Sequence, residues 1–186
     1  SVAATGLLGV FFSVMVYRDT HRPFWDNHMT TLKFFLTTGI LGLAMILLTI
    51  ILMNTFAPAN DFPRARFLYL LQLLDKIILA FCSVKLLFEG TMLLYLQGRP
   101  RSFLNKTAIL MTRELKYYTW ARFLCGISGG IILPMGGFNS LSSWGSGSLI
   151  VWAGIIFVLL LSGEFLERYL FFRAVVPLKM PGGKWD

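Results

Sequence analysis

The residues best suited to chemistry are polar side chains inside one long apolar segment. Asp75, Cys82 and Glu89 recur every seven residues there, so on an α-helix they fall within about 40° of one another, with Lys85 at their flank. A charge at the bilayer centre costs about 2.5–3.5 kcal/mol on insertion scales, so this polar stripe cannot face lipid. It predicts either a proton path or polar ligand site, or internal pairing in which Lys85 and Glu89 form an i,i+4 ion pair.

A second group of charges lies near the end of the last apolar segment. Glu164 and Arg168 stand four residues apart in the order that favours an ion pair on a helix, and Glu167 lies between them. This spacing predicts either a structural ion pair at the membrane surface or polar groups beside a ligand bound at that end.

The chain offers no ligand set for a metal or a haem. Its two histidines, His21 and His28, fall in one loop, whereas axial haem ligands are held inside a bundle, usually on facing helices. Cys82 and Cys125 lie singly in apolar segments without a CxxC motif, which predicts two buried structural thiols. No GxSxG, HExxH, P-loop or dinucleotide-binding motif occurs, so the sequence predicts no self-contained enzyme.

Long apolar segments must position these side chains. Of the 186 residues, 56% are hydrophobic and 14% are charged, against roughly a quarter charged in a typical soluble domain. Segments of about 18 or more apolar residues cross a membrane as helices. The sequence therefore predicts an all-α fold, a polytopic transmembrane helix bundle forming a single domain over residues 1–186. About five spans are expected, at 2–17, 32–56, 67–96, 117–135 and 148–172, followed by an irregular tail at 173–186.

The fourth span has distinctive flanks. The basic segment before it, from Ser102 to Lys116, predicts either an amphipathic helix at the membrane surface or an early extension of the span. Within the span, Gly126 and Gly130 form a small-xxx-small pattern that lets two helices approach closely. A Gly/Ser-rich loop is expected after it, over residues 136–147.

The net charge of +8 is concentrated in alternate connections between the spans. Such a distribution indicates membrane topology rather than nucleic-acid binding, and it supports the count of five spans. By the positive-inside rule the basic connections are cytoplasmic, the alternative being that they dock an acidic partner subunit. The basic residues on that side are Arg18, Arg22, Lys33, Arg99, Arg101, Lys106, Arg113, Lys116, Arg173, Lys179 and Lys184.

Two stretches carry a family resemblance. The first runs from Val14-Met15-Val16-Tyr17-Arg18 through Arg22-Pro23-Phe24-Trp25 to Lys33-Phe34-Phe35-Leu36-Thr37, and the second from Leu160 to Phe172. Both resemble the membrane anchor subunit of bacterial dimethyl-sulfoxide reductase and its relatives, which share their architecture with polysulfide-reductase anchors. The two stretches bracket most of the chain, and the middle is similar in hydropathy alone.

The resemblance implies a haem-free anchor subunit, non-catalytic by itself, in the bacterial cytoplasmic (inner) membrane. In that family an eight-helix anchor holds a molybdenum-pterin catalytic subunit and an iron–sulfur subunit at the membrane and exchanges electrons with quinone or quinol, either menaquinone or ubiquinone. This chain is shorter than such an anchor and is expected to be its C-terminal part, without the first three or so helices. Matched span by span, the basic loops face the catalytic subunits, a side that is periplasmic in the dimethyl-sulfoxide enzyme and that the charge bias makes cytoplasmic here.

A redox quinone site needs a donor or acid near each carbonyl and a proton route, because two protons accompany two electrons. Candidates for the carbonyls are His28, Glu164 and Arg168, those for the route are Asp75, Lys85 and Glu89, and those for docking the partner are Arg18, His21, Arg22 and Trp25. Two alternatives stay open. One is a transporter or channel fragment that uses the polar stripe, and the other is a purely structural anchor without quinone chemistry.

Overall fold

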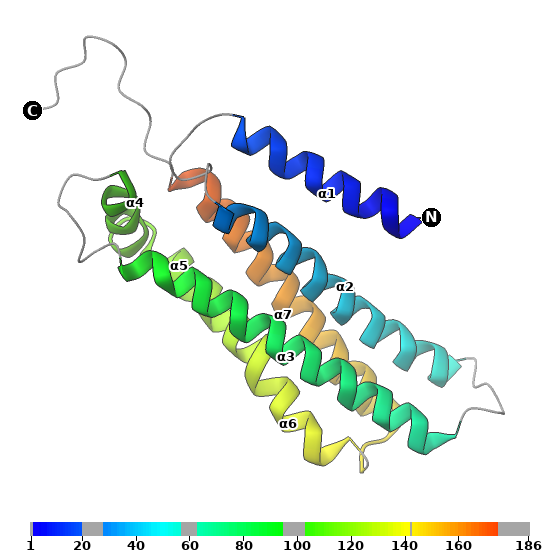
Figure 1. Ribbon diagram of the computed structural model, residues 1–186. Coiled ribbons are helices and arrows are strands. Elements are labelled where there is room, and N and C mark those ends of the chain that lie inside the picture. The colour runs from blue at the N-terminus through cyan, green and yellow to red at the C-terminus, as the bar shows by residue number, and fades with distance from the viewer. Residues whose placement is uncertain (1, 20–27, 57–62, 95–102, 142, 175–186) are drawn as a thin grey trace, which may run out of the picture.

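The computed structural model describes residues 2–19, 28–56, 63–94, 103–141 and 143–174. Over these ranges the chain forms helices and no strand (Figure 1). The fold is therefore all-helical in the part described. In chain order the elements are α1 (Val2–Arg18), α2 (His28–Phe56), α3 (Arg64–Leu94), α4 (Phe103–Thr112), α5 (Lys116–Ile127), the π-helix η2 (Ser128–Ile132), α6 (Leu133–Ser140) and α7 (Ser146–Arg173).

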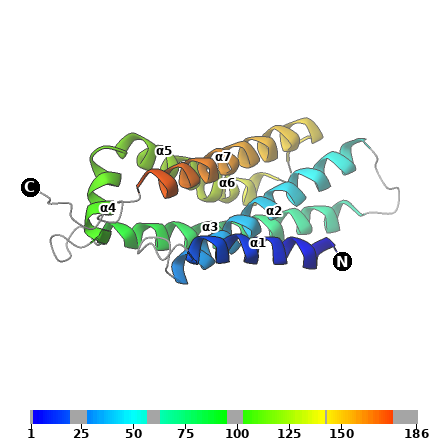
Figure 2. The ribbon, with the colours of Figure 1, turned by 90° about the horizontal axis from the view of Figure 1, so that it is seen from above.

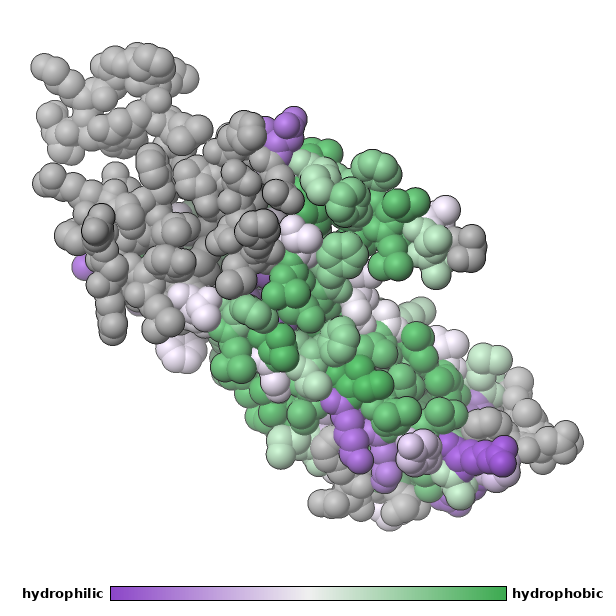
Figure 3. All heavy atoms as spheres, in the orientation of Figure 1, coloured by the Kyte–Doolittle hydropathy of each residue, from purple (hydrophilic) through white to green (hydrophobic). Residues whose placement is uncertain are grey.

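Among the described residues, three helices are long and apolar enough to cross a membrane, namely Thr30–Phe56, Arg64–Thr91 and Ser146–Arg173. Large apolar side chains point outward from them, as with Leu87 at 73% exposed and Phe165 at 67% exposed. On the face shown in Figure 3, apolar residues cover the middle of the molecule and hydrophilic ones gather toward one end. A surface of exposed apolar side chains is better suited to hydrocarbon than to water. The helical backbone is also suited to hydrocarbon, because its N–H and C=O groups bond to one another. Helix α1 is apolar too, but shorter.

The basic segment before the fourth span forms a helix of its own, α4. A turn at Arg113–Leu115 separates it from α5, and the Thr119 hydroxyl donates a 2.9 Å hydrogen bond back to the Met111 carbonyl. Of the two forms expected for this segment, a separate helix is therefore the one observed, rather than an extension of the span.

Helices α5, η2 and α6 follow one another without interruption, so the fourth helical run reaches from Lys116 to Ser140. Pro134 lies inside this run. Because proline lacks an N–H and its ring crowds the carbonyl four residues earlier, a regular helix cannot continue through it. The preceding turn widens to a π-helix instead, in which the Leu133 N–H donates to the Ser128 carbonyl.

The run also ends later than the sequence suggested. The expected loop began at Gly136, whereas α6 continues to Ser140. Gly137 is buried there, and a Cβ at this position would lie 2.6 Å from the Trp152 ring and 3.0 Å from a carboxyl oxygen of Asp75. Close packing against α3 and α7 thus outweighs the low helix propensity of glycine.

Helices α2, α3, the fourth run and α7 alternate in direction, so the connections gather at two ends of the bundle (Figures 1 and 2). One end holds the last residues of α1, α3 and α7 and the first residues of α2 and α5. We call it the basic end, because the lysine- and arginine-rich connections attach there. Helix α1 lies along the outside of α2.

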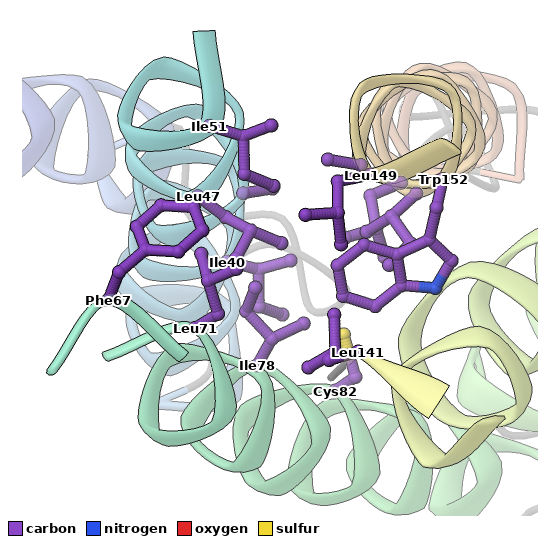
Figure 4. Close-up of a cluster of buried hydrophobic side chains, with 14 residues drawn as sticks. Ile40, Leu47, Ile51, Phe67, Leu71, Ile78, Cys82, Leu141, Leu149 and Trp152 are labelled. Carbon is purple, nitrogen blue, oxygen red and sulfur yellow. The ribbon is translucent and has the colours of Figure 1, made fainter. Parts of the chain in front are cut away.

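The main apolar core lies in the half of the bundle away from the basic end. Side chains of α2, α3 and α7 point toward one another there (Figure 4). Because lipid tails are as apolar as leucine, this packing is stabilised by van der Waals contact rather than by the hydrophobic effect. The fully buried members include Ile40, Leu47, Leu71, Ile78 and Ile156.

Glycines let the fourth run approach its neighbours closely. A Cβ at Gly130 would lie 2.5 Å from Cys82 Sγ in α3, and one at Gly126 would lie 2.9 Å from Leu86 of the same helix. A Cβ at Gly129 would lie 2.8 Å from Leu159 in α7. The small-xxx-small pattern therefore packs against α3, as such patterns do in membranes.

Replacing Gly130 by alanine is expected to destabilise the bundle by about 1–3 kcal/mol, because the new methyl overlaps the Cys82 side chain and forces the two helices apart. Thermal unfolding in detergent measures the effect. Gly42→Ala in α2 is the matched control, since no atom lies within 4 Å of a Cβ there. Equal unfolding temperatures for the two variants would contradict the close approach.

Candidate functional site

A group of charged side chains is buried in the bundle near the basic end, and Lys85 of α3 lies at its centre. This lysine is 1% exposed. Its ammonium donates a 2.6 Å hydrogen bond to the Thr37 hydroxyl of α2, donates another to Glu164 of α7, and lies 2.6 Å from a carboxylate oxygen of Glu167. An ammonium has three hydrogens to donate, and its partners here lie on α2 and α7. The Lys85 side chain therefore links α3 to both of these helices.

Arg122 brings the fourth run into the same group. Its Nη2 donates to Glu89 at 2.7 Å and to Glu164 at 3.2 Å. The other oxygen of Glu164 accepts from Lys85 and, at 2.8 Å, from Thr37, so this carboxylate bridges the two cations. We call the whole set the charge cluster, made up of Thr37, Lys85, Glu89, Arg122, Glu164 and Glu167.

The charge cluster is nearly balanced. Buried charges are tolerated in a membrane when they are paired and hydrogen-bonded, and leaving one unpaired is strongly unfavourable. Lys85 and Arg122 face three carboxylates, and Lys33 is close enough to act electrostatically on Glu89 and Glu167. The cluster itself has one carboxylate more than it has cations, so one carboxylate can take up a proton while each cation keeps a partner.

The pairing expected within α3 is wrong. Lys85 and Glu89 stand four residues apart, but Lys85 pairs with α7 and Glu89 pairs with Arg122. The i,i+4 rule describes an exposed helix surface. Inside a bundle, an opposite charge on a neighbouring helix lies closer and is better desolvated, so the pairs form between helices.

The pair expected within α7 is wrong for the same reason. Glu164 binds Lys85 and Arg122 instead of Arg168. The Arg168 guanidinium carbon lies 3.5 Å from the centroid of the Phe34 ring, a cation–π contact. Phe34 belongs to an aromatic group with Tyr17 and Phe171 where α1, α2 and α7 meet.

The polar stripe of α3 is buried, as the cost of exposing it to lipid requires. Asp75, Cys82 and Glu89 are 0%, 3% and 9% exposed. The structure divides the stripe, however. Glu89 belongs to the charge cluster, Cys82 packs against Gly130 of η2, and Asp75 lies apart from both, beside Gly137 and Trp152.

Several predicted residues lie outside the part of the chain that the structure describes. These are His21, Arg22 and Trp25, together with the side chains of Arg18 and His28. Arg18 ends α1 and His28 begins α2, both at the basic end. Their roles in docking and in quinone binding stay predictions.

Three members of the charge cluster were not among the predicted site residues. Arg122 carried a usable signal, because an arginine within an apolar span marks a functional or paired position by default. Glu167 was seen in the sequence only as a neighbour of the expected ion pair. Thr37 carried no signal, since hydroxyls are common in membrane helices and one bonds readily to its own backbone, as Thr37 does to the Lys33 carbonyl.

An apolar hollow of about 360 Å³ lies at the basic end, where α3 ends and α5 begins. That volume lies near the lower end of the roughly 300–1,000 Å³ typical of small-molecule sites. Two aromatic rings, Trp120 and Phe123, and the Lys116 side chain contribute to its wall. The lining residues are Gly90, Met111, Thr112, Lys116, Thr119, Trp120, Phe123 and Ile127, from α3, α4 and α5.

The hollow and the charge cluster share two helices. Gly90 follows Glu89 directly in α3, and Phe123 follows Arg122 directly in α5. The hollow and the Glu89–Arg122 ion pair therefore occupy the same stretches of α3 and α5, although neither Glu89 nor Arg122 lines the hollow. Glu89 is the predicted residue nearest to it along the chain, whereas its own lining residues were not predicted.

A second hollow, of about 320 Å³, lies at the opposite end of the bundle. Asn54, Arg64, Trp144 and Ser146 line it, from α2, α3 and the start of α7. It is far from the charge cluster, because α3 alone separates Arg64 from Lys85 by about 30 Å at 1.5 Å per residue. An apolar hollow and buried ionisable groups thus occur together at the basic end.

Three apolar helices and a buried, inter-helical charge cluster indicate a helical membrane protein whose polar chemistry is concentrated at one end. No family model, no curated protein and no solved structure matches the chain. The functional assignment therefore rests on the residues themselves.

Proposed function

We propose that the chain is a haem-free membrane anchor subunit of a molybdenum/iron–sulfur oxidoreductase complex, exchanging electrons between the iron–sulfur subunit and the quinone pool. One observation carries the proposal, namely that the apolar hollow and the buried Glu89–Arg122 pair occupy the same stretches of α3 and α5, one residue apart along each helix. The sequence resemblance at both ends of the chain supports the same assignment.

A membrane quinone combines the two requirements that this region meets. Its isoprenoid tail and ring need an apolar wall, for which Trp120, Phe123 and Ile127 are suited. Its two carbonyls need donors, and the Lys116 ammonium is the charged donor in the lining. In this assignment the head of the quinone lies against Lys116, at the start of α5.

The chemistry needs protons as well as electrons. Reduction of one quinone to quinol takes up two electrons and two protons. In the proposal the electrons come from, or return to, the iron–sulfur subunit, and the protons pass through Glu89 and the rest of the charge cluster. The near balance of charge in the cluster supports this role, because its carboxylates can take up a proton without leaving a cation unpaired.

The five-span topology belongs to this proposal. The fourth helical run, Lys116 to Ser140, would be one further span and the apolar α1 another. The chain would then form the C-terminal part of an eight-helix anchor in the bacterial inner membrane. Its basic end would face the cytoplasm and dock the iron–sulfur and molybdenum-pterin subunits.

Purification from native membranes in mild detergent tests the proposal. The expected result is that an iron–sulfur subunit and a molybdenum-containing subunit co-elute with the chain, and that added quinol reduces the clusters or added quinone oxidises them. Metal analysis and the visible spectrum of the clusters are the measurements.

Two outcomes would overturn the proposal. A lone chain that moves a solute into liposomes would identify a transporter that uses the polar stripe. Clusters that co-purify but neither accept electrons from quinol nor give them to quinone would identify a purely structural anchor.

A further inference from the structure

Asp75 is the one carboxyl among the described helices that is fully buried and has no partner. It lies near the middle of α3 and is 0% exposed, and neither of its carboxyl oxygens has a hydrogen-bond partner in the part of the chain described. The charge cluster does not reach it. Lys85 lies ten residues further along α3, about 15 Å away, with the buried side chains of Ile78 and Cys82 between them.

The described neighbours of Asp75 pack closely around its carboxyl. A Cβ at Gly137 of α6 would lie 3.0 Å from Asp75 Oδ2, so the glycine leaves room for the carboxyl. The Trp152 ring of α7 closes the same space, and its indole N–H donates to the Leu133 carbonyl at 3.2 Å rather than to Asp75. Leu71 and Ile78, one turn away on either side, are both 0% exposed.

No charge faces this carboxyl from the elements around it. Helices η2 and α6 contain no ionisable residue, and α7 has none before Glu164. The ionisable residues of α2, His28 and Lys33, lie at the basic end. On α3 itself the adjacent Lys76 is exposed and points away.

We propose that Asp75 is a proton-binding site in the middle of the bundle, enclosed by α3, α6 and α7. A carboxylate in this wall would lose its hydration and receive nothing in return, whereas a protonated acid carries no charge to stabilise. A proton needs a single oxygen. A metal cation needs several ligands, and no three His, Cys, Asp or Glu side chains gather among the residues described. The site goes beyond the proposed quinone exchange and does not depend on it.

The location gives the site a use. Glu89 and Asp75 lie on the same face of α3, one at the basic end and one at mid-depth. A proton held at Asp75 is therefore already part of the way across the membrane from the charge cluster. The fourth run, which carries Gly137, also contains the π-helix and Pro134. One part of the wall around Asp75 therefore belongs to a run in which the regular α-helix is interrupted.

Dicyclohexylcarbodiimide tests the assignment, because this apolar reagent adds to protonated carboxylic acids in membranes. The carboxyl oxygen bonds to the carbodiimide carbon, the acid proton passes to a nitrogen, and the adduct rearranges to a stable N-acylurea. The purified full chain, with any subunits it retains, is treated at neutral pH and the label is mapped by peptide mass spectrometry. The expected result is a label on Asp75 and none on the exposed Glu114.

Asp75→Asn is expected to lose this label, and in infrared spectra to lose one carbonyl stretch of a carboxylic acid. Wild-type protein unlabelled at Asp75, together with no such band, would overturn the proposal without any variant. Labelling that sodium ions suppress at constant pH would identify a metal-cation site and would also overturn it. Neither measurement uses quinone, so the result stands apart from that of the proposed function.

Discussion

Replacing Lys85 by methionine is expected to lower the free energy of unfolding by about 3–5 kcal/mol, the usual cost of removing one partner from a buried ion pair. Methionine keeps much of the length of the lysine side chain and removes the ammonium. Glu164 and Glu167 would then lose their common partner while still buried in α7. Reversible unfolding in mixed micelles, followed by tryptophan fluorescence, measures the change.

Lys76→Met is the matched control for that variant. It makes the same chemical change in the same helix, at a position that is exposed rather than buried, and is expected to leave stability unchanged or improved. Adding Glu167→Gln to Lys85→Met should restore part of the lost stability, because Glu167 pairs with Lys85 whereas Glu164 keeps Arg122 as a partner. A Lys85→Met protein as stable as Lys76→Met would show that the charge cluster does not hold the helices together.

Replacing Gly90 by phenylalanine is expected to block the apolar hollow and to weaken quinol binding about tenfold or more, which corresponds to about 1.4 kcal/mol. No atom lies within 4 Å of a Cβ at Gly90, and Gly90 lines the hollow, so the ring can enter it without displacing a helix. The rate of cluster reduction against quinol concentration in the purified complex is the measurement.

Gly42→Phe is the matched control for Gly90→Phe. It introduces the same side chain in a helix of similar length, at an exposed position where a Cβ again meets no atom within 4 Å. Both variants should fold equally well, since replacing a helical glycine improves helix propensity. If Gly90→Phe and Gly42→Phe reduce the clusters at the same quinol concentrations, the quinone does not bind in this hollow.

Sequence periodicity predicted the polar stripe correctly but not the partners of its residues. A seven-residue repeat places Asp75, Cys82 and Glu89 on one helix face whatever surrounds the helix. Which side chain each one meets depends on how four helices are rotated and displaced against each other, and no spacing within one helix contains that information. Hence Glu89 forms an ion pair with Arg122 and Cys82 packs against Gly130. The Asp75 carboxyl has no hydrogen-bond partner among the described residues.

The same distinction explains the boundaries of the fourth run. Glycine-rich composition favoured a loop from Gly136, and in an isolated chain that preference would decide. In the bundle, Gly137 is where α6 contacts Trp152 and Asp75, so the residues that weaken the helix locally are the ones that its packing requires.

By itself the sequence determined the all-helical class, three of the five expected spans as long apolar helices, and the inward direction of the polar stripe. These follow from hydropathy and helical period, because the backbone and every charge must be satisfied inside a membrane. The tertiary structure alone decided the charge cluster, the hollow at the basic end and the isolation of Asp75. Each of these is a relation between side chains on different helices, and it exists only once close packing has brought those helices together.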